Sequence, residues 1–297
     1  MKRWPKIERS WLVPPFVFAL AGLVPSCAQD DTKSGFVETP SEPDAAPPST
    51  GTTFGDAGAS IDPDVECAEE TEQIYVVATD KGLYRFYPED LKFVRVGTLG
   101  CPTTAGTFSM AIDRRGTAWV EYTDGRVYAV STHDATCKPT SFVAGQTGFE
   151  NFGMGFALND DDPKNGEKLY VAGDALATLD TKSFELKFLG SLTYGRTELT
   201  SIGSQLFAFS VESGVVARLN KESGATELTY RTSAIDSRAG FAFAHWGGIF
   251  WLFTGRATSK VTTYSPAADE SKVVIDNTGM LIVGAGSSTC APITPPK

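Results

Sequence analysis

Residues 67–297 predict an all-β domain built from one repeated unit of four short strands. Apolar runs alternate with turn residues throughout this region, and no stretch keeps a helical period. Asp124-Gly125 lies between two alternating runs, which is the strongest short-range signal for a hairpin. One strand type recurs five times, at offsets of 44, 49, 40 and 45 residues. Four strands in each such interval are typical of a β-propeller, so the sequence predicts five four-stranded blades.

The clearest blade covers residues 108–131. It reads as a strand at 108–112, a D-x-x-G turn from Asp113 to Gly116, a strand at 118–122, the Asp-Gly turn and a strand at 127–130, with a fourth strand expected at 141–143. The other blades repeat the pattern less clearly. Their first strands are expected at 155–158, 199–202 and 241–244, their second strands at 74–78, 169–172, 206–209 and 250–253, their third strands at 83–86, 176–179, 216–219 and 261–264, and two of their fourth strands at 186–189 and 226–229.

The first blade lacks an inner strand of its own, because residues 66–72 are polar. A spare apolar run stands at the other end of the chain, at 280–283. A propeller has to close its ring, and a blade made from both termini does this. We therefore expect the C-terminal strand to be the innermost strand of the first blade.

Four cysteines follow Cys27, and an even number in an exported chain suggests two disulfides. They have no C-x-x-C spacing, which disfavours zinc and thiol-redox sites. Four cysteines allow three pairings. The ring closure places Cys290 just after the innermost strand and Cys67 just before the next, so these two are expected to pair. Cys101 and Cys137 then pair by elimination, although simple blade geometry puts their loops on opposite faces.

The first 26 residues have the layout of a secretion signal, with four basic residues before an apolar run at 11–24. As a helix this run reaches about 21 Å, which is shorter than the roughly 30 Å hydrocarbon core, so it does not predict a membrane span. The exit Leu23-Val24-Pro25-Ser26-Cys27 resembles the bacterial lipobox, with Pro25 as a departure from its pattern. The resemblance implies lipidation of Cys27 and, because Ala28 is not an acid, an outer-membrane location. The alternative is ordinary cleavage nearby, with Cys27 a spare thiol.

Residues 28–66 predict a disordered acidic tether. They are rich in Pro, Ser, Thr, Gly and Ala, and they contain nine acids, one base and two aromatic residues. Such a segment cannot bury enough apolar surface to offset its chain entropy. The tether carries −8 of the net charge of −10, residues 1–26 carry +3, and −5 remains for residues 67–297. This balance excludes the basic footprint that nucleic-acid binding needs.

Two resemblances to known proteins support the same fold. The unit at 108–131 is similar to blades of NHL, gluconolactonase-like and sensor-type propellers, in which an alternating strand meets D-x-x-G. The whole chain resembles a group of uncharacterised exported bacterial lipoproteins with a β-propeller domain, through FGMGF at 152–156, HWGGIFWLF at 245–253 and GAGSSTCAP at 284–292. That resemblance implies a fold and a location but no activity.

Residues suited to catalysis are sparse. There is no G-x-S-x-G, no H-E-x-x-H and no Gly-rich phosphate loop. His133 lies in a polar loop, and His245 ends an apolar strand, so we interpret both as structural. The sequence therefore predicts no catalytic residue, no metal site and no cofactor. Two acidic patterns are interpreted as loop residues, with cation binding as the alternative: the run at 160–162, and the turn residues Asp80, Asp124, Asp174 and Glu212.

The best candidate site is the mouth of the central channel, where the inner strands begin. Asn151, Arg196, Glu198 and Arg238 stand at or just before those positions. The sequence favours a membrane-anchored, non-catalytic binding or scaffold propeller, whose partner is an unidentified protein or small molecule. One alternative is a propeller hydrolase or lactonase, which requires three or more buried acids or amides in the channel. Another is an envelope-assembly lipoprotein, which requires an exposed, partly apolar blade edge.

Overall fold

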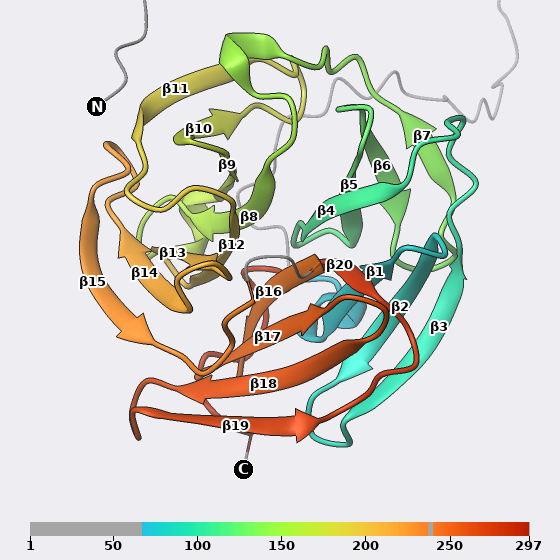
Figure 1. Cartoon of the computed structure of the whole chain (residues 1–297). Coiled ribbons are helices and arrows are strands. Elements are labelled where there is room, and N and C mark those ends of the chain that lie inside the picture. Colours follow the sequence, from blue (N-terminus) through green and yellow to red (C-terminus); the bar gives the residue numbers. More distant parts are fainter. Residues whose placement is uncertain (1–66, 237–239, 297) are drawn as a thin grey trace, which may run out of the picture. The chain divides into compact units, whose positions relative to one another are not determined.

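The computed structural model describes residues 67–236 and 240–296 (Figure 1). The predicted signal peptide (1–26), the predicted lipid site and tether (27–66) and Arg238 lie outside the described residues. Within the described part, twenty strands form five four-stranded antiparallel sheets, and three 3-10 turns interrupt the loops. No helix in this part of the chain is long and apolar enough to cross a membrane.

The five sheets are the blades of a β-propeller, which confirms the predicted fold and blade number. From the centre outward, the blades are β20 (Ile282–Gly286), β1 (Ile74–Ala78), β2 (Gly82–Tyr87) and β3 (Lys92–Thr98); β4 (Thr107–Ile112), β5 (Thr117–Tyr122), β6 (Val127–Ser131) and β7 (Cys137–Pro139); β8 (Gly153–Leu158), β9 (Glu167–Ala172), β10 (Ala175–Leu179) and β11 (Leu186–Ser191); β12 (Thr197–Ile202), β13 (Gln205–Ser210), β14 (Val215–Leu219) and β15 (Thr226–Arg231); and β16 (Gly240–Trp246), β17 (Ile249–Gly255), β18 (Ser259–Ser265) and β19 (Glu270–Ile275). The 3-10 turns are η1 (Glu69–Glu72), η2 (Gln146–Gly148) and η3 (Pro163–Asn165).

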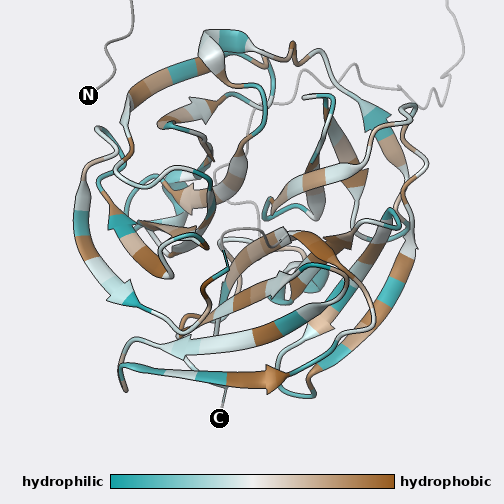
Figure 2. Cartoon of the chain, in the orientation of Figure 1, coloured by the Kyte–Doolittle hydropathy of each residue, from teal (hydrophilic) through white to brown (hydrophobic). Residues whose placement is uncertain are grey.

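The inner strands form the centre of the ring. Each of β20, β4, β8, β12 and β16 contacts the inner strands of both neighbouring blades, and Figure 1 shows them grouped around the middle. The apolar clusters combine residues of adjacent blades, so the core lies between blades rather than within them. Figure 2 shows the outer strands striped between hydrophilic and hydrophobic residues, as expected where one sheet face is solvated.

The ring closes as the sequence predicts. β20 pairs antiparallel with β1, with Tyr75 opposite Gly286, and completes the first blade. The predicted start at residue 280 is wrong, because β20 begins at Ile282. A Cβ on Gly284 would come within 2.9 Å of the backbone nitrogen of Met110 on β4. Two inner strands come so close here that only small side chains fit, which explains Gly284-Ala285-Gly286 in β20. Of the apolar run at 280–283, only Ile282 and Val283 belong to the strand.

The structure contains the disulfides Cys67–Cys290 and Cys101–Cys137, with Cα–Cα separations of 5.9 and 5.2 Å. The expectation that the loops of Cys101 and Cys137 lie on opposite faces is wrong. Neighbouring strands in a sheet rotate by about 20–25°, so the outer strand is turned by roughly 60–75° from the inner one. Outer strands consequently run along the rim (Figure 1), and the end of β3 meets the turn before β7.

The fourth strand of the second blade is also misplaced by the sequence prediction. It is β7 at Cys137–Pro139, before the apolar run at 141–143. Phe142 in that run leaves the sheet and packs edge-on against Phe152 of the third blade, with ring centroids 5.7 Å apart. Val143 is exposed. The apolar run thus packs between blades and forms no strand.

Candidate functional site

A pocket of about 410 Å³ opens where the inner strands of the second, third and fourth blades begin. Asn151, Arg196 and Glu198, three of the four predicted site residues, all line it. They meet because the loops leading into inner strands share one face of a propeller. The pocket walls are aromatic, and their phenylalanines come from four segments: Phe108, Phe149, Phe152 and Phe241.

Glu198 lies in β12 at the base of this pocket and is only 3% exposed. Its Oε2 accepts a hydrogen bond of 2.9 Å from the Ser109 hydroxyl on β4, and the backbone of Met154 on β8 also bonds to it. Burial raises the pKa of Glu198 well above the usual range, and the neighbouring Glu121 raises it further. The carboxyl group therefore links three inner strands and resists ionisation in the free protein.

Glu121 is the second buried carboxyl group beside the pocket, and the sequence reasoning missed it. It lies in β5 with no exposed surface. Its Oε2 accepts a 3.0 Å hydrogen bond from the backbone N–H of Phe152, and its Oε1 has no partner among the described residues. Burial raises its pKa well above the usual range, and Asp124 adds to the shift. The available signal was an acid inside the otherwise apolar run 118–122.

Arg196 brings a cation to the edge of the pocket. Its guanidinium lies 5.5 Å from the ring centroid of Phe241 and 3.5 Å from a carboxylate oxygen of Glu212. Its backbone has φ +43°, a conformation that side-chain-bearing residues seldom adopt. Both charged side chains are about half exposed, so the ion pair itself contributes little stability. For function, the relevant observation is that the Arg196 guanidinium, a cation, lies against the aromatic ring of Phe241 in the wall of this pocket.

His245 occupies the other half of the channel, in β16. It is buried, its backbone N–H donates to the Ser287 hydroxyl, and its Nε2 has no hydrogen-bond partner among the described residues. Thr200 of β12 lies 3.3 Å from the same hydroxyl. Burial lowers the pKa of His245 to about 4. A neutral histidine packed 6.0 Å from Phe250 fits the structural role expected for it.

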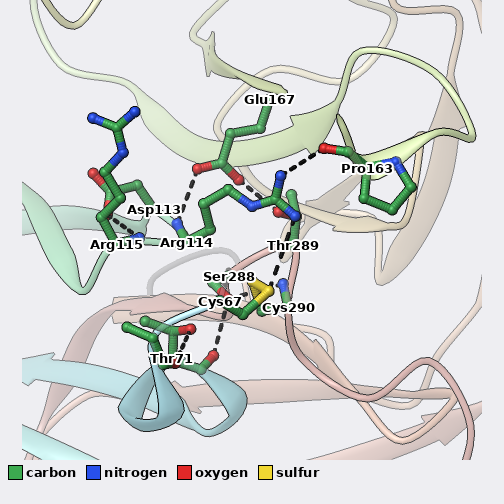
Figure 3. Close-up of a disulfide and its surroundings, with 11 residues drawn as sticks. Cys67, Thr71, Asp113, Arg114, Arg115, Pro163, Glu167, Ser288, Thr289 and Cys290 are labelled. Carbon is green, nitrogen blue, oxygen red and sulfur yellow. Dashed lines mark hydrogen bonds between the residues drawn. A yellow bond between two sulfur atoms is a disulfide. The ribbon is translucent and has the colours of Figure 1, made fainter. Parts of the chain in front are cut away.

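The face opposite the pocket contains a third acid, partly buried and close to the Cys67–Cys290 disulfide (Figure 3). Glu167, the first residue of β9, accepts a 2.6 Å hydrogen bond from the Thr289 hydroxyl and a 2.9 Å bond from the backbone N–H of Arg114. Burial raises the pKa of Glu167. The Arg114 guanidinium reaches the carbonyl of Pro163. Glu167 therefore clamps the first three blades together and is a structural residue.

The other acidic patterns have hydrogen-bond or ion-pair partners in their own or in neighbouring loops. The Asp160 carboxylate accepts bonds from Asp162 and Asn165, as expected for a loop. Three of the four acidic turn residues have local partners too: Asp80 with Gly82 and Tyr84, Asp124 with Thr103, and Glu212 with Arg196. Among residues 67–236 and 240–296, no three His, Cys, Asp or Glu side chains are grouped so as to hold a metal ion.

Comparisons with known proteins bear only on the fold. No family model matches the chain, and no curated protein matches it. Among solved structures, a chain of the nidogen/laminin complex is similar at 13% identity and a TM-score of 0.46, over 73% of this chain and 86% of that one. A structural-genomics protein of unknown function from Bacteroides thetaiotaomicron is similar at 14% identity and a TM-score of 0.43, over 69% of this chain and 55% of that one. The chain thus spans about half of the second protein, and its function has to be argued from its own residues.

Proposed function

We propose that this chain is a binding propeller that a lipid on Cys27 anchors in the outer membrane, and that it binds a small ligand in the pocket at the channel mouth. One observation carries the proposal. The pocket of about 410 Å³ has aromatic walls and a few polar groups, Asn151, Arg196 and Glu198, which converge on it. Ligand sites of small molecules have this size and this mixture of apolar walls and sparse polar groups.

The proposed location has independent support. Two disulfides suit an oxidising compartment outside the cytoplasm. The lipobox-like exit before Cys27 and the acidic tether at 28–66 suit a lipid-anchored domain. Incorporation of labelled palmitate tests the anchor: we expect label in the wild-type chain and none in Cys27→Ala. Fractionation of labelled cells then tests the outer membrane, and label in the inner membrane alone contradicts that location.

Filling the pocket tests ligand binding. Gly173 lines the pocket, and a Cβ there would lie 3.8 Å from the nearest atom of Phe149, an ordinary contact. Gly173→Leu should therefore fold and obstruct the pocket. Gly100→Leu is the matched control, because no atom lies within 4 Å of a Cβ at that position. In a thermal-shift screen of small polar metabolites, we expect at least one to stabilise wild type and Gly100→Leu but not Gly173→Leu. Equal stabilisation of all three proteins contradicts the proposed site.

A propeller hydrolase is the second candidate, and one observation favours it. Glu121 and Glu198 are buried neighbours with raised pKa values, a state suited to a general acid. The buried cluster required above needs a third acid or amide, and Asn151, which completes the group, is exposed. Chromogenic ester, lactone and glycoside substrates test this function. If the wild type hydrolyses one of these substrates and Glu198→Gln does not, the chain is a hydrolase and the purely binding role is rejected.

An envelope-assembly role lacks the continuous apolar edge that it requires. Four outer strands each expose one large hydrophobic side chain: Val94, Phe188, Leu228 and Val273. Because these four belong to four different blades, they are distributed among the described outer strands rather than gathered on one of them. Single exposed hydrophobic residues are common on soluble proteins. We therefore place the site at the pocket.

A further inference from the structure

We propose that the channel-mouth pocket binds an organic ammonium group, with Glu198 and Glu121 supplying the negative charge and the phenylalanine walls enclosing the cation. This inference rests on the proposed binding function, because it specifies the ligand of the same pocket. The pocket, the two buried carboxyl groups, the unpartnered oxygen and the aromatic walls carry it together.

The two carboxyl groups have no basic partner within the part of the chain that the structure describes. Among residues 67–236 and 240–296, no Lys, Arg or His forms an ion pair with Glu121 or Glu198. Glu121 is fully buried, and its Oε1 also has no hydrogen-bond partner there. A buried acid without a partner is costly to ionise, and two neighbouring acids are costlier. A ligand that brings a positive charge to Glu198 removes this cost, which a neutral ligand cannot do.

The walls of the pocket suit an ammonium group with carbon substituents. Four phenylalanines line it, and the face of an aromatic ring attracts a cation. Arg196 already places its guanidinium 5.5 Å from the ring centroid of Phe241. Apolar walls also favour the carbon groups of an alkylated ammonium over a hydrated metal ion, which prefers oxygen ligands on all sides.

The charge around the pocket favours a cation over an anion. Among the described lining residues there are three acids, Glu150, Asp174 and Glu198, and one base, Arg196. That base is already 3.5 Å from Glu212. Among the described residues, an anionic ligand would face these acids with one guanidinium, already shared with Glu212, to bind it, so this balance of charge disfavours an anion.

Binding of a cation should release protons. In the free protein, burial is the largest cause of the raised pKa of both acids. Repulsion from Glu121 adds to the shift of Glu198, and repulsion from Asp124 adds to that of Glu121. The Ser109 hydroxyl and the backbone of Met154 oppose the shift of Glu198, and the backbone of Phe152 and the Asn151 side chain oppose that of Glu121. Among the described residues, Arg196 is the cation that faces this group from the pocket edge. A bound ammonium stabilises the ionised form and lowers the pKa of both acids. Affinity should therefore rise with pH, and a neutral ligand should lack this dependence.

Calorimetric titration of the full chain in detergent tests the inference with a matched pair of probes. Choline carries a quaternary ammonium, and 3,3-dimethylbutan-1-ol is its uncharged isostere. We expect choline to bind at least tenfold tighter than the isostere, with affinity that rises between pH 6 and pH 8. Titration in phosphate and in Tris, which differ in ionisation heat, should show proton release with choline only. Butylammonium and butanoate extend the comparison to a primary amine and an anion.

Variants locate the charge preference. Glu198→Gln should reduce the preference for choline at least tenfold, while Glu185→Gln, at an exposed position outside the pocket, should leave it unchanged. Phe241→Leu is a second test that leaves both acids in place, and it should weaken choline more than the isostere. An unchanged preference in Phe241→Leu and in a folded Glu198→Gln overturns the inference.

The outcomes separate this inference from the proposed function. Equal binding of choline and its isostere, with both lost in Gly173→Leu, overturns the ammonium assignment and leaves the binding pocket intact. A screen in which only neutral or anionic compounds bind the pocket does the same. If no compound of the metabolite screen or of the probe set binds in a way that Gly173→Leu abolishes, both the inference and the proposed function fail.

Discussion

The disulfide that joins the two ends of the ring should contribute more to stability than the one on the rim. Cys67 and Cys290 are 223 residues apart, and Cys101 and Cys137 are 36 apart. In the chain-entropy model, a cross-link stabilises by restricting the unfolded chain, and the effect grows with the logarithm of the loop. At 25 °C this gives about 5.4 kcal/mol for the longer loop and about 3.8 kcal/mol for the shorter one.

Three proteins measure the difference: the oxidised wild type, the double variant Cys67→Ser with Cys290→Ser, and the double variant Cys101→Ser with Cys137→Ser. Equilibrium unfolding in guanidinium chloride gives the free energy of unfolding of each. We expect the variant without Cys67 and Cys290 to lose about 1.6 kcal/mol more than the other variant. Strain in a disulfide would reduce the loss caused by removing that disulfide, so the order of the two variants is tested rather than the absolute size of either loss.

Amide hydrogen exchange measures local opening of the ring in the same two variants. Without the covalent link, the pairing of β20 with β1 is the main closure of the ring. Amide exchange of Tyr75 and Val76 should therefore accelerate when Cys67 and Cys290 are removed and change little when Cys101 and Cys137 are removed. If removing the rim disulfide costs as much stability or more, or if exchange in β1 is equal in both variants, the argument from ring closure is refuted.

Three further substitutions give separate tests. In His245→Phe, the acid sensitivity caused by the buried histidine should vanish. Wild type should lose about 1.6 kcal/mol of this stability between pH 6.5 and pH 5, because the unfolded chain binds a proton that a histidine with a folded pKa of about 4 does not bind. Thermal unfolding of both proteins at both pH values measures this difference. Glu198→Gln should act in the opposite sense: its folded pKa is raised, so wild type loses stability as pH increases above about 4.5, by at most about 1.4 kcal/mol per pH unit, and the variant should show a shallower decline in the same assay. Gly190→Ala should lower the free energy of unfolding by roughly 1–3 kcal/mol, because its Cβ would overlap the carbonyl oxygen of Ser223. Gly100→Ala should change that free energy by no more than about 0.5 kcal/mol, and chemical unfolding of both variants measures the difference.

The sequence predicted the features that depend on local pattern and on the logic of a closed ring. Hairpin turns and recurring strands have local signals, so the five blades and most strand positions followed from them. Closure by a C-terminal strand follows because the first blade has no inner strand before Ile74. Asn151, Arg196 and Glu198 were brought together by the same reasoning, since loops that lead into inner strands share a face.

The missed features depend on packing between elements distant in sequence. Glu121 stands in a strand that reads as apolar, and its neighbour Glu198 is 77 positions away on another blade. The contact between Cys101 and Cys137 depends on the twist that turns outer strands along the rim. The start of β20 depends on how closely Gly284 approaches β4. None of these has a signature in a window of neighbouring residues.

The seam disulfide and the pocket lie at opposite ends of the inner strands. β8 begins at Gly153 beside the pocket, and its six residues span about 17 Å before the chain turns towards Glu167 beside the disulfide. Cys67 therefore fixes the start of the propeller on the face away from the pocket. With the proposed lipid on Cys27, the tether would connect to the domain at Cys67, which is on that face. The attachment point of the tether and the pocket are therefore on different faces of the propeller, which is compatible with the proposed binding of a soluble ligand.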